Sequence, residues 1–480
     1  MTDILIVGAG VVGCALARAL SRYRESILVL EAGYDVASGA SKANSGIVHA
    51  GFDAKPGSLK AKTNVEGAKR FAALCKALSV PYAQNGALVL GFSQEDLETL
   101  CGLLAQGSKN GVSGLRLLSR EEALALEPGL NPEIVGALHA PTSAITSPYE
   151  LTYALADHAA LGGVRFAFGE RVEGCWYDGL WHVTTGRGTH EARILVNCAG
   201  TGGGVLHNAI SPRKVTIVPR RGQYRLYDRM NPPRLSMTLF QCPTKMGKGV
   251  LVTPTVHGNL MTGPTAEDIP DGEDTATSAQ GLATVQKTAR RSMIAPMGNE
   301  ITSFSGIRAH AQEGDFLIGR VDRCEAAYEA IGIESPGLSA APAIAEMLCE
   351  QIAEDMRLEP KAEPIPYPTM PKPFFEMDEA QRREAIARDP AYGNVVCRCE
   401  EVTEAEIRAA IRRPVGARSI DGVKRRVRAG MGRCQGGFCS PRVAEILAEE
   451  LGISLLEVTK SGGASPLFTG TMADALKEGR

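Results

Sequence analysis

The sequence contains no apolar run of the roughly 18 residues that a transmembrane helix needs, so no membrane span is expected. Its start also lacks the basic, apolar and small-residue segments of a signal peptide, because a strand over Ile4–Val7 is predicted almost at once. We therefore expect a cytoplasmic protein. Peripheral association with a membrane stays compatible with these observations.

An excess of one charge is missing as well. The 52 Lys and Arg residues nearly balance the 54 Asp and Glu residues, which gives a formal net charge of −2. This balance argues against general binding to nucleic acid or to an anionic membrane surface. A chain of 480 residues that is 44% hydrophobic can form about three globular domains.

The 12 cysteines are expected to be thiols or metal ligands and not disulfides, because disulfides are rare in a reducing cytoplasm. Eight of them are scattered singly, among them Cys14, Cys75 and Cys198. For these eight we expect small buried apolar side chains. The other four are clustered near the C-terminus.

A glycine turn, Gly8-Ala9-Gly10-Val11-Val12-Gly13, follows the first strand and opens a helix predicted over 11–23. Gly8 permits the tight turn, Gly10 lets the backbone approach a pyrophosphate, and Gly13 lets helix and strand pack closely. The helix N-terminus attracts the phosphates. The turn therefore predicts a dinucleotide site in which Val12 also lies.

An acidic residue, Glu31, ends the next strand, predicted over 26–31. It can accept hydrogen bonds from a ribose hydroxyl and would repel a 2′-phosphate, which disfavours NADP. NAD and FAD both remain compatible with this unit alone.

Two later segments favour FAD by resemblance. The strand-to-glycine element 196–200 and the strand–loop–helix at 328–352 would return to the first sheet, and this arrangement resembles the D-amino-acid-oxidase-like flavoprotein superfamily. In that superfamily the late helix N-terminus lies beside the flavin, where it stabilises negative charge by about 0.3–1 kcal/mol or more.

The resemblance is sharper in Ser41–Lys60, SKANSGIVHAGFDAKPGSLK, and in Ile217–Tyr224, Thr253–Asp268, Phe304–His310 and Gly332–Ala345. These stretches resemble FAD-dependent glycerol-3-phosphate and L-2-hydroxyglutarate dehydrogenases, including the anaerobic glycerol-3-phosphate dehydrogenase large subunit. The expected cofactor-binding residues are Gly8, Gly10, Val12, Gly13, Glu31, Ser41, Asn44, Ser45, Gly200, Gly332, Gly337, Leu338 and Ser339.

Two residues are expected at the reacting centre. Alcohol oxidation needs a base that works near neutral pH, and the resemblance places His49 at the flavin, with His310 as second choice. An anionic substrate needs a fixed cation, and Arg308 matches the substrate-binding arginine of the related enzymes. Arg221 and Lys55 are weaker predictions. The alternatives are that His49 is an ordinary loop histidine and that Arg308 forms a surface salt bridge.

One departure affects the substrate. Many glycerol-3-phosphate dehydrogenases carry an arginine shortly after the active-site histidine, whereas this chain continues from His49 to Asp53 without one. The stretch KPGSLKA instead resembles the hydroxyglutarate enzymes. Glycerol 3-phosphate is the first prediction and L-2-hydroxyglutarate the second, with an amine or imino-acid oxidase and a non-catalytic electron-transfer subunit as further alternatives.

Four cysteines form a CxC pair, Cys397 and Cys399, and after 34 residues a CxxxxC pair, Cys434 and Cys439. Four thiolates can hold zinc or a 2Fe–2S cluster. The basic residues between 424 and 433 favour the anionic cluster, although a solvated basic face is the alternative for that run. VCRCEEVT and GMGRCQGGFCSPR also resemble bacterioferritin-associated-ferredoxin-like domains, which implies 2Fe–2S and electron transfer to an acceptor protein or a partner flavoprotein subunit.

These observations predict an α/β and α+β protein with a discontinuous Rossmann-like FAD domain, a mostly antiparallel substrate domain and a small iron–sulfur domain. The FAD domain is expected over 1–80, 147–213 and 304–358, and the substrate domain over 81–146 and 214–303. A proline-rich linker is expected over 359–394, the 2Fe–2S domain over 395–452 and a tail over 453–480.

Overall fold

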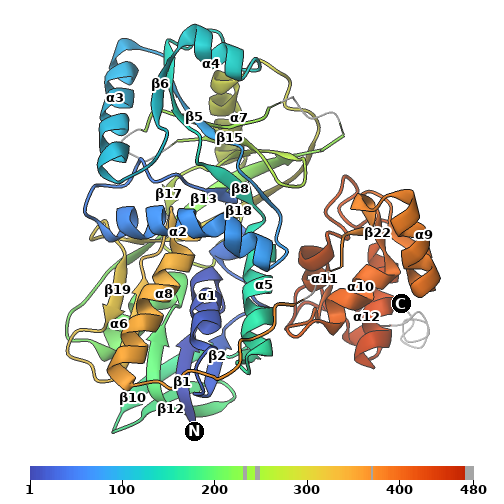
Figure 1. Cartoon of the computed structure of the whole chain (residues 1–480). Coiled ribbons are helices and arrows are strands. Elements are labelled where there is room, and N and C mark those ends of the chain that lie inside the picture. Colours follow the sequence, from blue (N-terminus) through green and yellow to red (C-terminus); the bar gives the residue numbers. More distant parts are fainter. Residues whose placement is uncertain (231–234, 244–248, 369–370, 471–480) are drawn as a thin grey trace.

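The computed structural model describes residues 1–230, 235–243, 249–368 and 371–470. The chain forms two stacked α/β bodies with a mostly helical C-terminal unit at their side (Figure 1). Within the described ranges no helix is both long and apolar enough to cross a bilayer.

The lower body is built on an eight-stranded sheet whose central strands are parallel, in the order β20, β12, β1, β2, β9. A hairpin and one antiparallel strand extend it. The strands are β1 (Thr2–Val7), β2 (Ile27–Glu31), β9 (Arg165–Phe168), β10 (Val172–Tyr177), β11 (Trp181–Thr185), β12 (Gly188–Asn197), β19 (Leu317–Arg320) and β20 (Ala327–Ile331).

Alternating side chains of β1 fill two cores. Ile4 and Ile6 pack in the core that contains α1 (Val11–Leu20), α5 (Pro148–Leu161) and α8 (Gly337–Met356). Leu5 and Val7 pack in a second core that includes β11 and α6 (Gly203–Ile210). Burial on both faces explains why β1 reads as an uninterrupted apolar run.

The upper body contains a nine-stranded sheet, mostly antiparallel, as the strand-rich stretch after residue 214 predicts. Its helices are α3 (Gln94–Lys109), α4 (Arg120–Leu126) and α7 (Ala279–Ser292). Its strands are β5 (Ala87–Gly91), β6 (Arg116–Ser119), β7 (Gly136–Ala140), β13 (Ile217–Tyr227), β14 (Thr238–Gln241), β15 (Leu251–Pro254), β16 (Leu260–Gly263), β17 (Glu267–Asp268) and β18 (Glu300–Ala311).

The boundary expected at residue 304 falls inside β18. This strand pairs with β13 from Ile217 opposite Ala311 to Tyr227 opposite Glu300. Because β18 is hydrogen-bonded along its length, the chain leaves the upper sheet only after residue 311 and then enters β19 of the lower sheet.

A small three-stranded sheet connects the two bodies. It consists of β3 (Ile47–Val48), β8 (Ala144–Thr146) and β4 (Tyr82–Ala83). Helix α2 (Leu59–Ala77) packs against α8 on the same side of the molecule. This sheet fixes the chain immediately before His49.

The C-terminal unit has its own core, formed by residues such as Ile407, Val423, Ile446 and Leu447. Its elements are α9 (Glu379–Arg388), β21 (Val395–Cys397), β22 (Val402–Thr403), α10 (Glu404–Arg412), α11 (Ile420–Val427) and α12 (Ser440–Leu451). The sequence pattern predicts α10 and α12 but not α11. The basic residues of α11 make its apolar, buried face hard to recognise in the sequence. Helix α9 lies inside the segment expected to be a linker. Among the described residues, five 3-10 turns complete the fold: η1 (Ala40–Lys42), η2 (Gly200–Gly202), η3 (Phe374–Glu376), η4 (Pro390–Gly393) and η5 (Leu455–Glu457).

All twelve cysteines are free. Burial raises the pKa of Cys75 and of Cys198 to about 12, which keeps both thiols protonated and unreactive. The expectation of burial is wrong for Cys101, which is exposed on α3, and Cys175, Cys242 and Cys324 are only half-buried.

A close helix contact positions α8, the helix that begins beside the cavity described below. A Cβ atom on Gly67 of α2 would lie 2.0 Å from the carbonyl oxygen of Ser339. We expect Gly67→Ala to destabilise the protein by about 1–3 kcal/mol, because α8 would have to move. The measurement is the midpoint of thermal unfolding.

The matched control is Gly102→Ala in α3, where nothing lies within 4 Å of an added Cβ. This change should raise the midpoint slightly, because alanine favours a helix over glycine by about 1 kcal/mol. Equal midpoints for Gly67→Ala and the wild type would contradict the tight α2–α8 contact.

Candidate functional site

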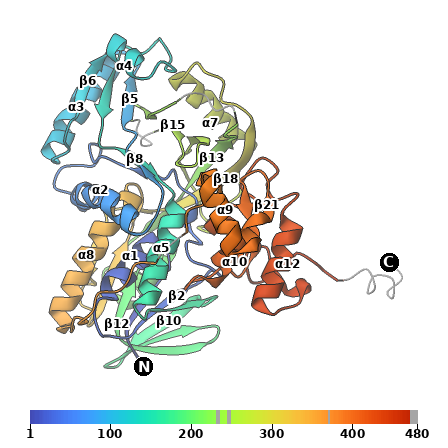
Figure 2. The ribbon, with the colours of Figure 1, turned by 45° about the vertical axis from the view of Figure 1, so that its right-hand side comes forward.

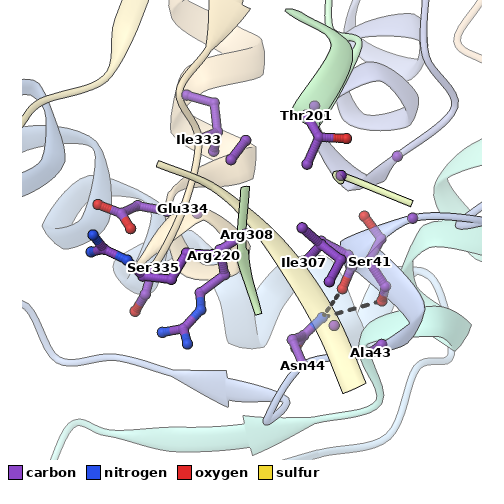
Figure 3. Close-up of a pocket in the computed structure, with 18 of the residues that line it drawn as sticks. Ser41, Ala43, Asn44, Thr201, Arg220, Ile307, Arg308, Ile333, Glu334 and Ser335 are labelled. Atoms are coloured by element: carbon purple, nitrogen blue, oxygen red, sulfur yellow. Dashed lines mark hydrogen bonds between the residues drawn. The ribbon is translucent and has the colours of Figure 1, made fainter. Parts of the chain in front are cut away.

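A cavity of about 1450 Å³ lies between the two bodies, at the carboxyl ends of β1 and β12. Strands β13 and β18 of the upper sheet line its other side. Figure 3 shows Ser41, Ala43 and Asn44 on one side of this space, with Arg220, Arg308, Glu334 and Ser335 opposite. The glycine turn and the start of α8 both line the cavity, so the cavity extends from one to the other.

The glycine turn has the backbone that the sequence predicts. Gly8 has φ +105°, and a Cβ there would lie 2.4 Å from the carbonyl oxygen of Cys198. A Cβ on Gly13 would lie 2.0 Å from the carbonyl oxygen of Gly8. Gly8, Gly10 and Val12 line the cavity, whereas Gly13 packs behind the wall.

Glu31 lies at the end of β2 with its carboxylate turned toward the glycine turn. It accepts hydrogen bonds from the backbone N–H of Ala9 at 2.8 Å and of Gly33 at 2.7 Å. Burial raises the pKa of Glu31, although both hydrogen bonds oppose that effect. Its place on the cavity wall fits a ribose hydroxyl donating to the carboxylate.

The loop around η1 forms another wall. Asn44 donates from Nδ2 to the carbonyl oxygens of Ala40 at 3.0 Å and Ser41 at 3.2 Å, as the dashed lines in Figure 3 show. Ser41 Oγ accepts from the N–H of Val11 at 2.9 Å, which joins this loop to the start of α1. Ser41, Asn44 and Ser45 all line the cavity, as does Gly200 after β12.

The start of α8 closes the far end. Gly337 and Leu338 line the cavity, whereas Gly332 packs against Ala311 and Ser339 lies behind the wall. Ser339 Oγ accepts from the backbone N–H of His49 at 2.7 Å. The residues expected to bind FAD thus divide into those that face the cavity and those that shape it. A cavity with a glycine turn at one end and a helix N-terminus at the other fits an extended dinucleotide such as FAD.

His49 lines the cavity. Its Nε2 lies 3.4 Å from Ser335 Oγ, and its ring lies 5.8 Å from the ring of Phe240. The serine hydroxyl and the aromatic ring hold the imidazole at the edge of the open space. An imidazole in this position can take a proton from a bound alcohol.

Arg308 also lines the cavity, on β18. Its Nη2 donates to the carbonyl oxygen of Thr265 at 2.6 Å, and its buried Nε has no hydrogen-bond partner among the described residues. The guanidinium as a whole is half-buried and lines the cavity with a fixed positive charge. The position therefore fits an anionic ligand.

The neighbouring arginines on β13 face opposite ways, because side chains alternate along a strand. Arg220 lines the cavity and pairs with Asp268, with N–O distances of 2.5 and 3.0 Å. Arg221 is absent from the cavity wall and pairs with Glu267 and Asp274. Arg220 therefore lies at the cavity, whereas the predicted Arg221 does not.

Glu334 joins two basic groups. Lys60 Nζ lies 2.7 Å and His310 Nδ1 2.9 Å from Glu334 Oε1. Burial raises the pKa of Glu334, but Lys60 and His310 outweigh it and hold the pKa below its usual range. His310 pairs with the cavity-lining Glu334 and does not itself line the cavity, whereas Lys55 does.

The four clustered cysteines lie together at the face of the C-terminal unit. Cys399 Sγ lies 3.7 Å from Cys434 Sγ. A hydrogen bond from Cys439 lowers the pKa of Cys397 to about 6, and the backbone N–H groups of Gly430 and Glu400 act in the same direction. The sulfurs thus form two pairs, one half-buried and one buried.

Two pairs of thiols suit a 2Fe–2S cluster, in which four cysteine thiolates hold two irons. Gly430 and Gly436 bring backbone N–H groups to Cys397 and Cys434, which is how a protein tunes a cluster.

The basic run has a different role from the expected one. Arg426 pairs with Asp35, Arg428 with Glu400 and Arg433 with Asp228. Arg426 and Arg428 are buried, so a solvated basic face is wrong for these two. Lys424 remains electrostatically coupled to Cys439.

Sequence reasoning missed Arg220, Ser335, Phe240, Lys60 and Glu334. Strand alternation in IVPRRGQY indicates that one of the two arginines faces the site, but it cannot tell which one. The other four come together only through the packing of β14, α2 and the loop before α8 around His49.

Comparison with known proteins gives two family matches and two relatives. The family described as FAD dependent oxidoreductase matches residues 3–351, and the BFD-like [2Fe-2S] binding domain matches residues 395–449. Glycerol 3-phosphate dehydrogenase of Caloramator mitchellensis is 45% identical over 473 residues, 98% of each chain. The mitochondrial L-2-hydroxyglutarate dehydrogenase of Arabidopsis thaliana is 28% identical and covers 73% of this chain and 83% of its own.

A solved structure shares the fold of 77% of the chain. The L-alpha-glycerophosphate oxidase of Mycoplasma pneumoniae, with FAD bound, superimposes with a TM-score of 0.73 at 30% identity. The match covers 77% of this chain and 99% of that one. The remaining part of this chain therefore has no counterpart in that oxidase.

The cysteine assignment can be tested by substitution. We expect Cys434→Ser to lose most of the iron and the broad visible absorption of the cluster while the flavin absorption remains, because one of four thiolate ligands is gone. Iron and zinc are measured by elemental analysis of the purified protein. Cys101→Ser, on the exposed face of α3, is the matched control and should keep its iron. Full iron content in Cys434→Ser would refute the assignment.

Proposed function

The chain belongs to the FAD dependent oxidoreductase family, and from that premise we propose that it is a dehydrogenase that oxidises sn-glycerol 3-phosphate to dihydroxyacetone phosphate. It is an FAD-dependent enzyme with a 2Fe–2S domain. The observation that supports this substrate is the full-length similarity to a glycerol 3-phosphate dehydrogenase, at 45% identity.

The groups at the cavity support oxidation of an anionic alcohol. When bound, the flavin supplies the N5 atom that accepts a hydride from the substrate carbon. His49 takes the hydroxyl proton at Nε2, and Ser335 keeps the ring turned toward the cavity. The two events together convert the alcohol to a ketone.

Arg308 binds the anionic group of the substrate. Its guanidinium lines the cavity, and the planar fork of an arginine matches a phosphate. The residues after His49 carry no arginine, so Arg308 supplies the charge, assisted by Lys55, which lines the same cavity. Arg220 contributes less charge because Asp268 already neutralises it.

The second candidate substrate is L-2-hydroxyglutarate. It is favoured by the stretch KPGSLKA and by the relatives of that name, which match this chain at lower identity and over less of its length. An arginine and a histidine at one cavity suit both compounds, since each is an anionic secondary alcohol. The higher sequence identity to the glycerol 3-phosphate dehydrogenase favours glycerol 3-phosphate as the substrate.

The electron acceptor is proposed to be a protein or a partner flavoprotein subunit in the cytoplasm. The FAD-containing oxidase of Mycoplasma pneumoniae matches 77% of this chain with 99% of its own, whereas this chain also matches a 2Fe–2S domain over residues 395–449. The additional 2Fe–2S domain gives electrons a route other than dioxygen. A cluster would be redundant in a simple oxidase.

The substrate proposal predicts a spectral change. Under anaerobic conditions glycerol 3-phosphate should bleach the flavin band, whereas L-2-hydroxyglutarate and amino acids should leave it unchanged. The measurement is an absorption spectrum before and after each addition. Bleaching by L-2-hydroxyglutarate alone would transfer the assignment to the second candidate, and bleaching by an amino acid alone would favour an amine oxidase.

The two site residues should differ in their kinetic effects. We expect His49→Gln to lower kcat about 10²–10⁴-fold with little change in KM, because the base is lost. Arg308→Lys should raise KM roughly tenfold or more, because a bidentate contact to an anion is weakened.

Steady-state kinetics with an artificial acceptor measures both effects. Arg320→Lys is the control, since this exposed arginine pairs with Asp355 outside the cavity. A wild-type kcat in His49→Gln would remove that residue from the reaction.

A further inference from the structure

We propose that the 2Fe–2S domain is held in one fixed position against the FAD domain, and that Asp35 and Asp157 are the positioning residues that hold it there for electron transfer from the flavin. The proposal rests on the proposed function in one respect, that electrons leave the flavin through the cluster. Figure 2 shows the C-terminal unit against α5 and below the upper sheet.

The first anchor is a buried ion pair between Asp35 and Arg426. Both guanidinium Nη atoms lie 2.7 Å from the two carboxylate oxygens, and the arginine side chain has no exposed surface. The same guanidinium lies 4.0 Å above the ring of Tyr153 in α5. Since removing one partner leaves a buried charge unpaired, such a pair strongly resists separation.

The second anchor joins Asp157 of α5 to the loop after α10. Arg413 Nε lies 2.5 Å from Asp157 Oδ2, and the backbone N–H of Val415 donates to Oδ1 at 2.9 Å. The Asp157 side chain is 1% exposed. Two carboxylates of the FAD domain therefore each bind an arginine of the cluster domain.

A third junction lies beside the cluster loop. Arg428 Nε bonds Glu400 Oε2 at 2.8 Å within its own domain, Nη1 donates to Tyr149 Oη at 3.3 Å, and Nη2 donates to Asn259 Oδ1 at 3.3 Å. This one arginine touches the cluster domain, the FAD domain and the upper sheet. Tyr149 Oη also lies 3.5 Å from Met431 Sδ, three residues before Cys434.

The same surface continues to the flavin cavity. Gly46 follows the cavity-lining Ser45, and a Cβ on it would lie 3.4 Å from Pro148, the residue before Tyr149. A short series of packed residues thus leads from the cavity wall to the cluster loop. Electron tunnelling weakens steeply with distance, so contact here sets the rate.

The ends of the C-terminal unit are also fixed. In the connecting segment, Lys361 Nζ donates to the carbonyl oxygens of Ser21 at 2.8 Å and Gly162 at 2.5 Å. After α12, Gly462 packs so closely on Tyr34 that a Cβ would lie 2.2 Å from that side chain. The chain before and after the cluster core therefore contacts the FAD domain, at Lys361 and at Gly462.

In the proposed step the reduced flavin would give up its two electrons one at a time, because a 2Fe–2S cluster accepts one. The cluster would pass the first electron to the acceptor protein before it takes the second, and the flavin would return to its oxidised form as its proton is released to solvent. The positioning residues change the rate of this step and leave the hydride transfer from substrate unchanged, because neither lines the cavity.

The test uses the full-length protein with both cofactors, in Asp35→Asn and Asp157→Asn variants. Flavin is reduced photochemically with light and EDTA, and cluster reduction is followed by freeze-quench electron paramagnetic resonance. We expect cluster reduction to slow about tenfold or more, since each change breaks a buried pair. Trypsin should also cut faster between residues 359 and 394.

Glu379→Gln is the matched control, because its exposed pair with Arg383 lies on α9 away from the two anchors. Photoreduction needs no substrate, so the result stands even if glycerol 3-phosphate fails to bleach the flavin. If either Asn variant is insoluble, Arg413→Lys, which keeps the charge at the second anchor, takes its place. Wild-type rates of cluster reduction together with wild-type protection from trypsin would overturn the proposal.

Discussion

Backbone contact between β1 and β12 is the constraint on which the site depends. The carbonyl oxygen of Cys198 lies where a Cβ of Gly8 would be, and the carbonyl oxygen of Gly8 lies where a Cβ of Gly13 would be. These contacts bring α1 and the end of β12 to one edge of the sheet. The cavity opens at that edge, because the chain turns away after each parallel strand.

One segment of the chain, residues 32–45, serves two sites. Ser41, Asn44 and Ser45 line the cavity on one side, and Asp35 binds Arg426 of the cluster domain on the other. A flavin site and a cluster domain that share a segment are joined mechanically. This arrangement, with the buried ion pair of Asp35 and Arg426, suits an enzyme whose electrons cross between the two parts.

Much of the cofactor site could be predicted because its signals are local. The glycine turn, Glu31 after β2 and the two cysteine pairs depend on spacing along the chain, which sequence records directly. Arg221 illustrates the limit. Two adjacent arginines on a strand must face opposite ways, but which one meets the cavity depends on the pairing of β13 with β17 and β18. Helix α11 was missed for a related reason, since the burial of Arg426 depends on a partner 391 positions away.

The sequence by itself determined the dinucleotide turn, the quartet of thiols and the apolar strands, because each requires particular residues at fixed short spacing. Tertiary structure alone decided that Ser335 and Phe240 hold His49, that Arg308 lines the cavity, and that the basic run docks one domain on another. These features join residues that are far apart in the chain. Their partners are set by how sheets and helices pack, and no local spacing encodes that.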